Sequence, residues 1–519
     1  RGGDPSRGRR GWAGPKPTIA QDPASRRDAC APLPATSDDC ARPPRPASGG
    51  VRVAAPWRCV ARGHPVQERS SDQGLPPPSP LSAAARRAIA ARAASLDELR
   101  VALAAAPPAA DGDVRPGDMT GLAAWLTACA PGDVEAFGRR LAWDGLDLMT
   151  AAWLLTDEAA EQLVAGEPLW LAWLDRILDQ AAGCTAEIAG GAVPEVERWT
   201  AAGLPYAELL VPVVRAAGAA LDQRLGDDWL GLVTPAARDR WADQLARELA
   251  GVAQLAWQQR FEALRKAGGE PAGETMEDGA PASGLYQYFV LSLLHQDLPA
   301  LFEELPVLAR HLAVLTARHV DNVERLVRRL AADHDAIAHE LFGGAGVAPV
   351  EDVAPALSDP HDGRQRVAVL TGAGGRRLVY KPRDVRLERA FGDLLADLAR
   401  AGCDAVPAGM AVLARDGYGW EACVAQEPLG SPDAVHAYYR RAGGLACVAW
   451  LLGGRDLHME NVVATAQGPV LVDLEALFAP GEPRAGGDGP TAAETGVGQA
   501  ASLPSSCLQT GLITYRTGG

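Results

Sequence analysis

The sequence predicts an α+β protein in which a helical N-terminal region precedes a region of short strands and helices. Two observations carry this prediction. Apolar residues recur every three to four positions from about Leu81 to Phe342, which is the period of an amphipathic helix. After Gly343 the apolar residues recur at every second position, as they do in strands. We therefore expect a helical region over 81–345 and a strand-bearing region over 346–519.

Residues 1–80 have a different composition from the rest. They hold 15 of the 40 prolines, many Arg, Ser and Gly, and no apolar periodicity. Such a segment cannot bury enough apolar surface to offset the entropy of ordering it, so we predict a disordered lead-in. Its 13 basic against 7 acidic side chains leave an RNA-binding arm as an alternative, but it has neither interleaved aromatics nor a repeated motif.

The helical region is predicted to contain long amphipathic helices joined by loops. Two apolar stripes at helical spacing are expected in the core: Trp241, Leu245, Leu249, Val252 and Ala256, and further on Val320, Val323, Val327 and Leu330. The Gly- and Pro-rich stretch Gly268–Gly284 is expected to be a surface loop between two helical subdomains. The tryptophans gathered in this region could line a peptide groove, but we expect them to be packing residues.

The region after Gly343 is predicted as an alternation of strands and helices. Its expected elements, in order, are a hairpin of Arg366–Thr371 and Arg377–Tyr380 around the turn Gly372–Gly375, a helix over Arg386–Ala401, strands near Met410–Leu413 and Trp420–Val424, a helix over Ser431–Leu452, and a hairpin of Asn461–Thr465 and Val470–Val472. This is the order of elements in the two-lobed kinase plan.

Composition excludes several classes of protein. The nine cysteines are scattered and never form a CxxC pair, so we expect no zinc site in this chain and a reducing, cytoplasmic location. The net charge of −15 disfavours nucleic acid as a partner. The longest apolar run, near Tyr288–Leu294, is too short for a membrane span. The chain begins with Arg1 and has no methionine before Met119, so we expect its natural start to lie elsewhere.

The segment Gly454–Asn461 (GRDLHMEN) carries the most informative chemistry, and Asp473 follows twelve residues after its end. Phosphoryl transfer needs an aspartate beside the incoming hydroxyl, a nearby asparagine that ligates magnesium, and a second aspartate that bridges metal and phosphates. Asp456, Asn461 and Asp473 supply these three. Lys381, which ends a predicted strand, would supply a fixed cation for the nucleotide phosphates.

Each of these signals is weak alone, and only their combination in this order favours a kinase-like site. His458 would either contact phosphate or brace its loop by hydrogen bonds, and bracing is the preferred interpretation. Glu475 is a candidate for a further metal ligand or a supporting group. The turn Gly372–Gly375 lacks a full GxGxxG, so a hairpin turn explains it adequately.

Four segments of the sequence resemble the dehydratase portion of class II lanthipeptide synthetases, the LanM family. They are Leu305–Ile337, Ser358–His361 (SDPH), Tyr380–Phe391 (YKPRDVRLERAF) and Gly453–Phe478 (GGRDLHMENVVATAQGPVLVDLEALF). The resemblance covers roughly residues 81–515. It implies a lipid-kinase-like fold that uses ATP and Mg²⁺ to phosphorylate Ser and Thr of a ribosomally made precursor peptide. Elimination of the phosphate then leaves dehydroalanine or dehydrobutyrine.

The resemblance also assigns roles to individual positions. It implies nucleotide and catalytic roles for eight residues: Asp359, His361, Lys381, Asp456, His458, Asn461, Asp473 and Glu475. Of these, Lys381, Asp359 and His361 are expected at the nucleotide, Asp456, His458 and Lys381 in catalysis, and Asn461, Asp473 and Glu475 at the metal. Asp359 and His361 rest on the resemblance only, because SDPH by itself reads as a turn.

The family's zinc-bearing cyclase and the residues that assist elimination lie beyond the position that corresponds to Gly519. We therefore expect the kinase-like domain to be incomplete at its C-terminus, with no cyclisation and no efficient elimination. Two alternatives stay open. A small-molecule phosphotransferase would share the site residues but would not require the preceding helices. An inactive, truncated remnant would bind peptide or nucleotide without turnover.

Overall fold

We describe the protein from a computed structural model. The structure describes residues 81–105, 117–164, 166–191, 193–268, 284–360, 362–478 and 507–512. The predicted lead-in over 1–80 lies outside these ranges, and so does most of the predicted loop Gly268–Gly284.

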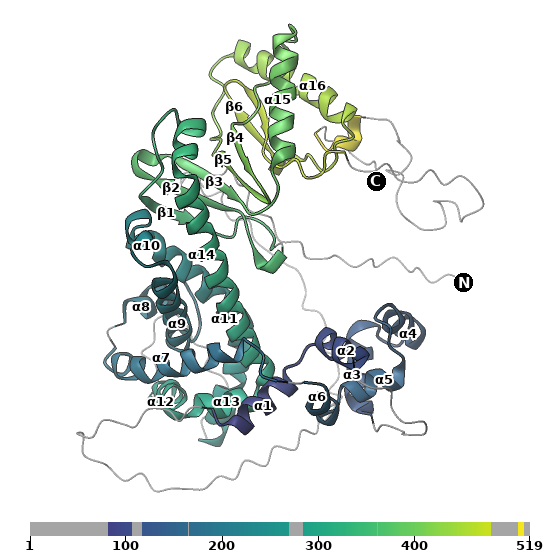
Figure 1. The fold of residues 1–519 in the computed structure, drawn as a ribbon, viewed down its shortest axis with the longest axis vertical. Coiled ribbons are helices and arrows are strands. Elements are labelled where there is room, and N and C mark those ends of the chain that lie inside the picture. The colour runs from purple at the N-terminus through teal and green to yellow at the C-terminus, as the bar shows by residue number, and fades with distance from the viewer. Residues whose placement is uncertain are drawn as a thin grey trace, which may run out of the picture. The chain divides into compact units, whose positions relative to one another are not determined.

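The N-terminal part of the described chain is helical, as predicted (Figure 1). Its helices are α1 (Ala83–Arg92), α2 (Leu96–Ala105), α3 (Met119–Cys129), α4 (Val134–Trp143), α5 (Leu148–Leu154), α6 (Asp157–Leu163), α7 (Leu171–Ala189), α8 (Pro194–Ala201), α9 (Ala207–Leu225), α10 (Asp227–Leu232), α11 (Pro235–Ala267), α12 (Gly284–Ser292), α13 (Leu298–Glu304) and α14 (Pro306–Phe342). A π-helical turn over Leu293–Asp297 joins α12 to α13.

Two long helices, α11 and α14, connect this part to the strands. Each begins with proline in its first turn, where the missing N–H costs no hydrogen bond. Gly343 ends α14 in the left-handed conformation, at φ 62°, which glycine adopts without a Cβ clash.

The predicted stripe on α14 is confirmed, because Val320, Val323, Val327 and Leu330 are all buried. The stripe on α11 is confirmed at Trp241, Leu245 and Leu249 but is wrong at Val252, which is 41% exposed. On this 33-residue helix the buried face continues instead through three residues shifted by one position: Ala253, Trp257 and Phe261. The buried face keeps a spacing of four residues from Trp241 to Phe261, whereas the predicted stripe took a step of three at Val252.

Most of the tryptophans of this part pack in the core, as expected. Those that are buried are Trp153, Trp170, Trp173, Trp199, Trp229, Trp241 and Trp257. Trp143 is an exception, since 81% of it is exposed at the end of α4.

The strands form a five-stranded antiparallel sheet of order β1-β2-β3-β5-β4 and a separate two-stranded hairpin. The sheet strands are β1 (Val350–Ala354), β2 (Ala368–Gly372), β3 (Arg377–Lys381), β4 (Val412–Arg415) and β5 (Tyr418–Ala422), and the hairpin strands are β6 (Val462–Thr465) and β7 (Gly468–Leu471). The β2–β3 hairpin is confirmed, and its turn uses positive φ at Gly374 and Gly375. The predicted positions of β4 and β5 each differ from the observed positions by two residues. Strand β1 was not predicted.

Two helices accompany the strands, and both were predicted. They are α15 (Arg386–Arg400), between β3 and β4, and α16 (Pro432–Leu451), between β5 and β6. Ser431 caps α16 by accepting a hydrogen bond from the Ala434 N–H. A short 3-10 helix, Cys507–Thr510, contacts α16 near the end of the described chain.

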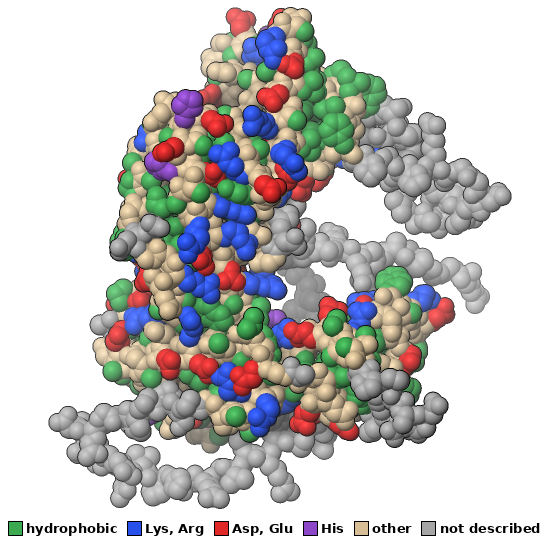
Figure 2. Space-filling model, in the orientation of Figure 1, with side chains coloured by type: hydrophobic (Ala, Val, Ile, Leu, Met, Phe, Trp, Pro, Cys, Tyr) green, Lys and Arg blue, Asp and Glu red, His purple; other side chains and the backbone are tan. Residues whose placement is uncertain are grey.

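Helix α14 packs along one face of the sheet. Its Asp333, which is buried, accepts hydrogen bonds from Arg415 Nε at 2.7 Å, Tyr418 Oη at 2.8 Å and Trp420 Nε1 at 2.9 Å. Arg329, one helical turn earlier, donates to Tyr380 Oη at 2.6 Å. On the face drawn in Figure 2, basic side chains gather over the middle of the molecule, where α14 runs in Figure 1.

One hydrophobic core contains residues of the helices and of the sheet. It includes Leu326 and Leu330 of α14 together with Leu370, Leu378 and Trp420 of the strands. The α+β class is therefore confirmed, whereas the two-lobed kinase-like arrangement stays a prediction. Among the described residues, no helix is both long and apolar enough to cross a membrane.

Candidate active site

Lys381 lies at the end of β3 and is buried, with 1% of its surface exposed. Its ammonium group donates a hydrogen bond of 2.7 Å to the backbone carbonyl of Val472. Nζ also lies 2.9 Å from Glu421 Oε1 and 3.6 Å from Glu388 Oε1. A buried charge is tolerated only when it is paired in this way, so Lys381 is held in place by three partners from three different elements.

The two glutamates around Lys381 are themselves buried. Glu388 comes from the first turn of α15, the helix that follows β3, and Glu421 comes from β5, the strand beside β3. Burial raises the pKa of Glu421, and the nearby ammonium of Lys381 opposes that rise. The pair from a strand lysine and a helix glutamate is the arrangement by which protein kinases fix their phosphate-binding lysine.

Arg383, two residues after Lys381, joins the sheet to the end of the β6–β7 hairpin. Its Nη2 donates to Asp473 Oδ1 at 2.9 Å, and its Nη1 lies 2.6 Å from Glu388 Oε1. That second contact has the distance of an ion pair without the alignment of a hydrogen bond. Nε of Arg383 lies 3.9 Å from Glu475, so one guanidinium meets three carboxylates.

Sequence reasoning did not single out Arg383, Glu388 or Glu421. A signal for Glu421 was present, since a glutamate inside the apolar strand Tyr418–Ala422 needs a buried cation as a partner. Glu388 lies seven residues after Lys381 near the start of a strongly amphipathic predicted helix, but which face of that helix meets β3 depends on the tertiary fold.

The loop that precedes β6 holds Asp456, His458 and Asn461 together. Asp456 adopts the left-handed conformation at φ 55°, and its side chain is 70% exposed. Its backbone carbonyl accepts a hydrogen bond of 2.8 Å from Asn461 Nδ2. A non-glycine residue held in this conformation is a common feature of functional loops.

His458 stabilises this loop. Its Nδ1 accepts a hydrogen bond of 3.3 Å from the Glu460 N–H, which caps the short helix Met459–Asn461. Because Nδ1 accepts, the neutral ring carries its proton on Nε2, which lies 3.5 Å from Asp456 Oδ1. These contacts fit the preferred interpretation of His458 as a bracing residue and orient the Asp456 carboxylate at the same time.

The chain after Asp456 is anchored from two sides. Leu457 is fully buried, and its N–H donates 2.8 Å to the carbonyl of Thr510 in the short C-terminal helix. Gly511 adjoins the same backbone so closely that a Cβ there would lie 3.1 Å from the Leu457 nitrogen. The segment Cys507–Leu512 therefore supports the loop that carries Asp456.

The β6–β7 hairpin places Asn461 opposite the residues that precede Asp473. Val462 pairs with Leu471, and the Val472 N–H donates 3.0 Å to the Asn461 carbonyl. Val472 thus touches Asn461 through its N–H and Lys381 through its carbonyl. The side chain of Asp473 is 31% exposed and that of Glu475 is 56% exposed. The Glu475 N–H donates a hydrogen bond of 3.4 Å to Asp473 Oδ1.

The connection between β1 and β2 lies at the same end of the sheet as Lys381, because Ala368 at the start of β2 pairs with Tyr380. Asp359 is in this connection and is exposed, and Ser358 Oγ bridges it by donating to the Asp359 carbonyl and accepting from the Val367 N–H. His361 lies outside the described residues. The turn Gly372–Gly375 lies at the opposite end of β2 and β3, which favours its interpretation as a hairpin turn.

The residues predicted to bind a metal are Asn461, Asp473 and Glu475. Among the described residues no three His, Cys, Asp or Glu side chains gather closely enough to hold a metal ion by themselves. Mg²⁺ does not require such a group, since it usually takes one or two carboxylates and completes its shell with water and substrate phosphates. Asn461 and Asp473 carry side-chain oxygens of the kind that this mode uses.

Two comparisons with known proteins bear on this site. Residues 305–517 match a family model described as "Domain of unknown function (DUF4135)", and this range includes every predicted site residue. Over 131 residues the chain is 28% identical to the lacticin 481/lactococcin biosynthesis protein LcnDR2 of Lactococcus lactis subsp. lactis. The aligned segment makes up 23% of this chain and 14% of that protein, so the match spans a small part of the relative.

Proposed function

We propose that this chain, which is related to the class II lanthipeptide synthetases and contains a DUF4135 domain over residues 305–517, takes part in lanthipeptide biosynthesis by phosphorylating a precursor peptide. The reaction transfers the terminal phosphoryl group of ATP to a Ser or Thr hydroxyl. In the family, elimination of that phosphate follows, and we assign residues here to the transfer step only.

One observation carries this proposal. The hydrogen bond from Lys381 Nζ to the Val472 carbonyl joins the predicted phosphate-binding cation to the residue before Asp473, and the N–H of the same residue bonds to Asn461. Lys381, Asn461 and Asp473, which lie 12 to 92 positions apart in the sequence, are thereby connected through one residue, Val472. Structural packing alone would not require a lysine at this buried position.

Each residue then has a stated task. Lys381 would face the nucleotide phosphates, with Glu388 and Glu421 holding its position. Asn461 and Asp473 would hold Mg²⁺, which neutralises charge on the phosphates when it is bound. Asp456 would accept the proton of the attacking hydroxyl, oriented by His458.

A mass-spectrometric assay tests this function. The 519-residue chain is incubated with ATP, Mg²⁺ and a precursor peptide encoded beside its gene, and we expect a mass gain of one phosphoryl group on Ser or Thr. Asp456→Ala should lower the rate by at least about a hundredfold, because it removes the group that accepts the proton. Asp416→Ala is a matched control on the exposed β4–β5 turn. Phosphorylation that persists in Asp456→Ala would refute the assigned role.

A further inference from the structure

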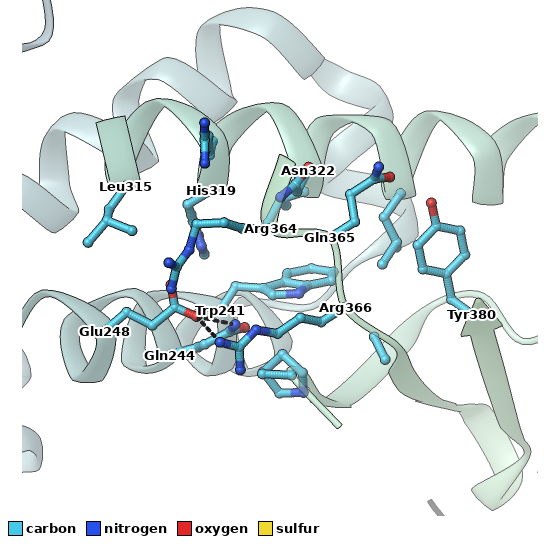
Figure 3. Close-up of a pocket in the computed structure, with 16 residues that line it drawn as sticks. Trp241, Gln244, Glu248, Leu315, His319, Asn322, Arg364, Gln365, Arg366 and Tyr380 are labelled. Carbon is cyan, nitrogen blue, oxygen red and sulfur yellow. Dashed lines mark hydrogen bonds and ion pairs between the residues drawn. The ribbon is translucent and has the colours of Figure 1, made fainter. Parts of the chain in front are cut away.

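A polar cavity lies between α11, α14 and the segment that leads into β2 (Figure 3). Its lining includes Glu248 of α11, His319 of α14, and Arg364 and Arg366 of the segment before β2. Tyr380 also lines it, whereas the next residue, Lys381, points to the opposite face of the sheet, as successive residues of a strand do. This cavity is therefore separate from the candidate active site.

The charges that line this cavity are not balanced. Glu248 lies between two guanidinium groups, 3.5 Å from Arg364 Nη2 and 3.8 Å from Arg366 Nη2 (Figure 3). Charge-assisted hydrogen bonds of this kind are normally about 2.7 to 2.9 Å long. One carboxylate at long range therefore faces two arginines, and it pairs closely with neither.

Both arginines also keep a buried donor without a partner. The Nε atoms of Arg364 and Arg366 are shielded from solvent, and neither finds a hydrogen-bond acceptor among the residues that the structure describes. Buried donors in folded proteins are nearly always satisfied, and an unsatisfied one calls for a bound water or ion. Arg364 is moreover held at φ 64°, a conformation that is unfavourable for a non-glycine residue.

His319 adds a neutral polar group to the wall. Burial lowers its pKa to about 4, so the imidazole is uncharged at pH 7 and the positive charge of the cavity comes from the arginines. Asn322, one turn further along α14, donates to the Gly363 carbonyl at 3.1 Å and fixes the segment that carries Arg364.

The size of the cavity selects a small ligand. Its volume is about 60 Å³, whereas one water molecule needs roughly 10–15 Å³ on this measure. It therefore has room for a few waters or one polyatomic ion, but not for a nucleoside. A tetrahedral oxyanion would supply the negative charge that Glu248 supplies only in part.

We propose that this cavity is an anion site that binds inorganic phosphate, or an oxyanion of the same shape, between Arg364 and Arg366. Because these residues precede β2 in the connection that also carries Asp359, a bound anion would fix the conformation of that connection. The site rests on its own geometry and does not depend on the proposed function.

Calorimetric titration of inorganic phosphate into the 519-residue chain, at constant ionic strength, tests the proposal. We expect saturable binding that Arg366→Gln and Arg364→Gln each weaken at least tenfold. Glu248→Gln should instead tighten binding severalfold, because it removes the carboxylate that competes for the same guanidinium groups. Arg240→Gln is the matched control, since it breaks an ion pair between α11 and β1 outside this cavity and should leave affinity unchanged.

Further measurements of phosphate binding distinguish this site from the proposed nucleotide site. Asp473→Asn should leave phosphate affinity unchanged, and ADP should not displace the phosphate. If Asp473→Asn abolishes binding, or if ADP displaces phosphate, the anion lies in the nucleotide site and the proposal is overturned. It is also overturned if the wild type shows no saturable binding, or if Glu248→Gln weakens it. The sign of the Glu248→Gln effect decides the matter even where an arginine variant fails to fold.

Discussion

At the scale of single residues, Lys381 has more charged neighbours than the packing of a buried side chain requires. Burying an ammonium group and two carboxylates together costs desolvation energy that an apolar cluster of the same volume would not. The ion pairs with Glu388 and Glu421 offset that cost without making it a source of stability. Such a group is expected at a site where charge is used.

Lys381→Met should therefore destabilise the fold, because it leaves the buried carboxylate of Glu421 without its cation and leaves Glu388 with Arg383 alone. We expect a loss of about 3 to 5 kcal/mol in the free energy of unfolding, measured by urea denaturation. The double variant Lys381→Met/Glu421→Gln should recover part of this loss. Lys266→Met, at the exposed end of α11, is the control and should change stability by less than about 0.5 kcal/mol. Equal stability of Lys381→Met and wild type would contradict the account.

His319 predicts a pH dependence of stability. Its pKa is about 4 in the folded protein against about 6.5 when unfolded, so the unfolded state binds the extra proton between these values. The contribution of His319 is then fully present above pH 6.5 and is lost as the pH falls towards 4. At pH 5 the loss is at most about 2 kcal/mol, and less if solvent reaches the ring.

The comparison of wild type with His319→Gln isolates this effect, since every other titrating group is shared. The difference between their unfolding free energies should shrink as the pH falls from 7 to 5. A difference that stays constant over that range would show that His319 is not held neutral by burial.

At the scale of elements, the sequence pattern correctly predicted the strands and helices that are determined by local interactions. The β2–β3 hairpin, α15, α16 and the β6–β7 hairpin each carry their own turn, cap or periodicity, and all four were predicted. Strand β1 (Val350–Ala354) was not, because its central Glu-Asp pair breaks the apolar alternation. Its pairing with β2 and its bridge to Val233, between α10 and α11, are tertiary contacts that no local pattern reveals.

The residues of the candidate site also divide into those that a local pattern predicts and those that only the tertiary fold brings together. Asp456, Asn461 and Asp473 lie on one loop and hairpin, so their spacing in the sequence was enough to group them. Glu388 and Glu421 reach Lys381 only because α15 and β5 pack against β3, and that packing is not encoded in any short segment. The predicted roles of all eight site residues stay predictions until they are tested.

The attachment of α14 to the sheet depends on Asp333, which accepts three hydrogen bonds from β4 and β5. Asp333→Ala would leave the buried Trp420 indole N–H without its acceptor, so we expect a loss of about 3 kcal/mol in unfolding free energy. Asp333→Asn should cost less, because one acceptor oxygen remains. Asp335→Ala, two residues along the same helix and fully exposed, should have no measurable effect. A similar loss in both alanine variants would contradict this role.

At the scale of the whole molecule, α14 and the five-stranded sheet share one core, which includes Val323 and Leu330 of α14 with Leu370 and Leu378 of the sheet. A shared core predicts a shared unfolding transition. Hydrogen exchange of the intact chain should give the same opening free energy for core amides of α14 and for those of β3 and β5. Exchange of the strand amides at a clearly lower free energy would show that the sheet opens independently of the helices.

Calorimetry of nucleotide binding tests the proposal that Lys381, Asn461 and Asp473 form a site for ATP and Mg²⁺. We expect the 519-residue chain to bind ATP in a magnesium-dependent manner, and we expect Asp473→Asn to weaken this affinity at least tenfold, because a carboxylate ligand is lost. Asp404→Asn, an exposed aspartate on the loop after α15, should bind as the wild type does. Equal magnesium-dependent affinity in wild type and Asp473→Asn would contradict the claim.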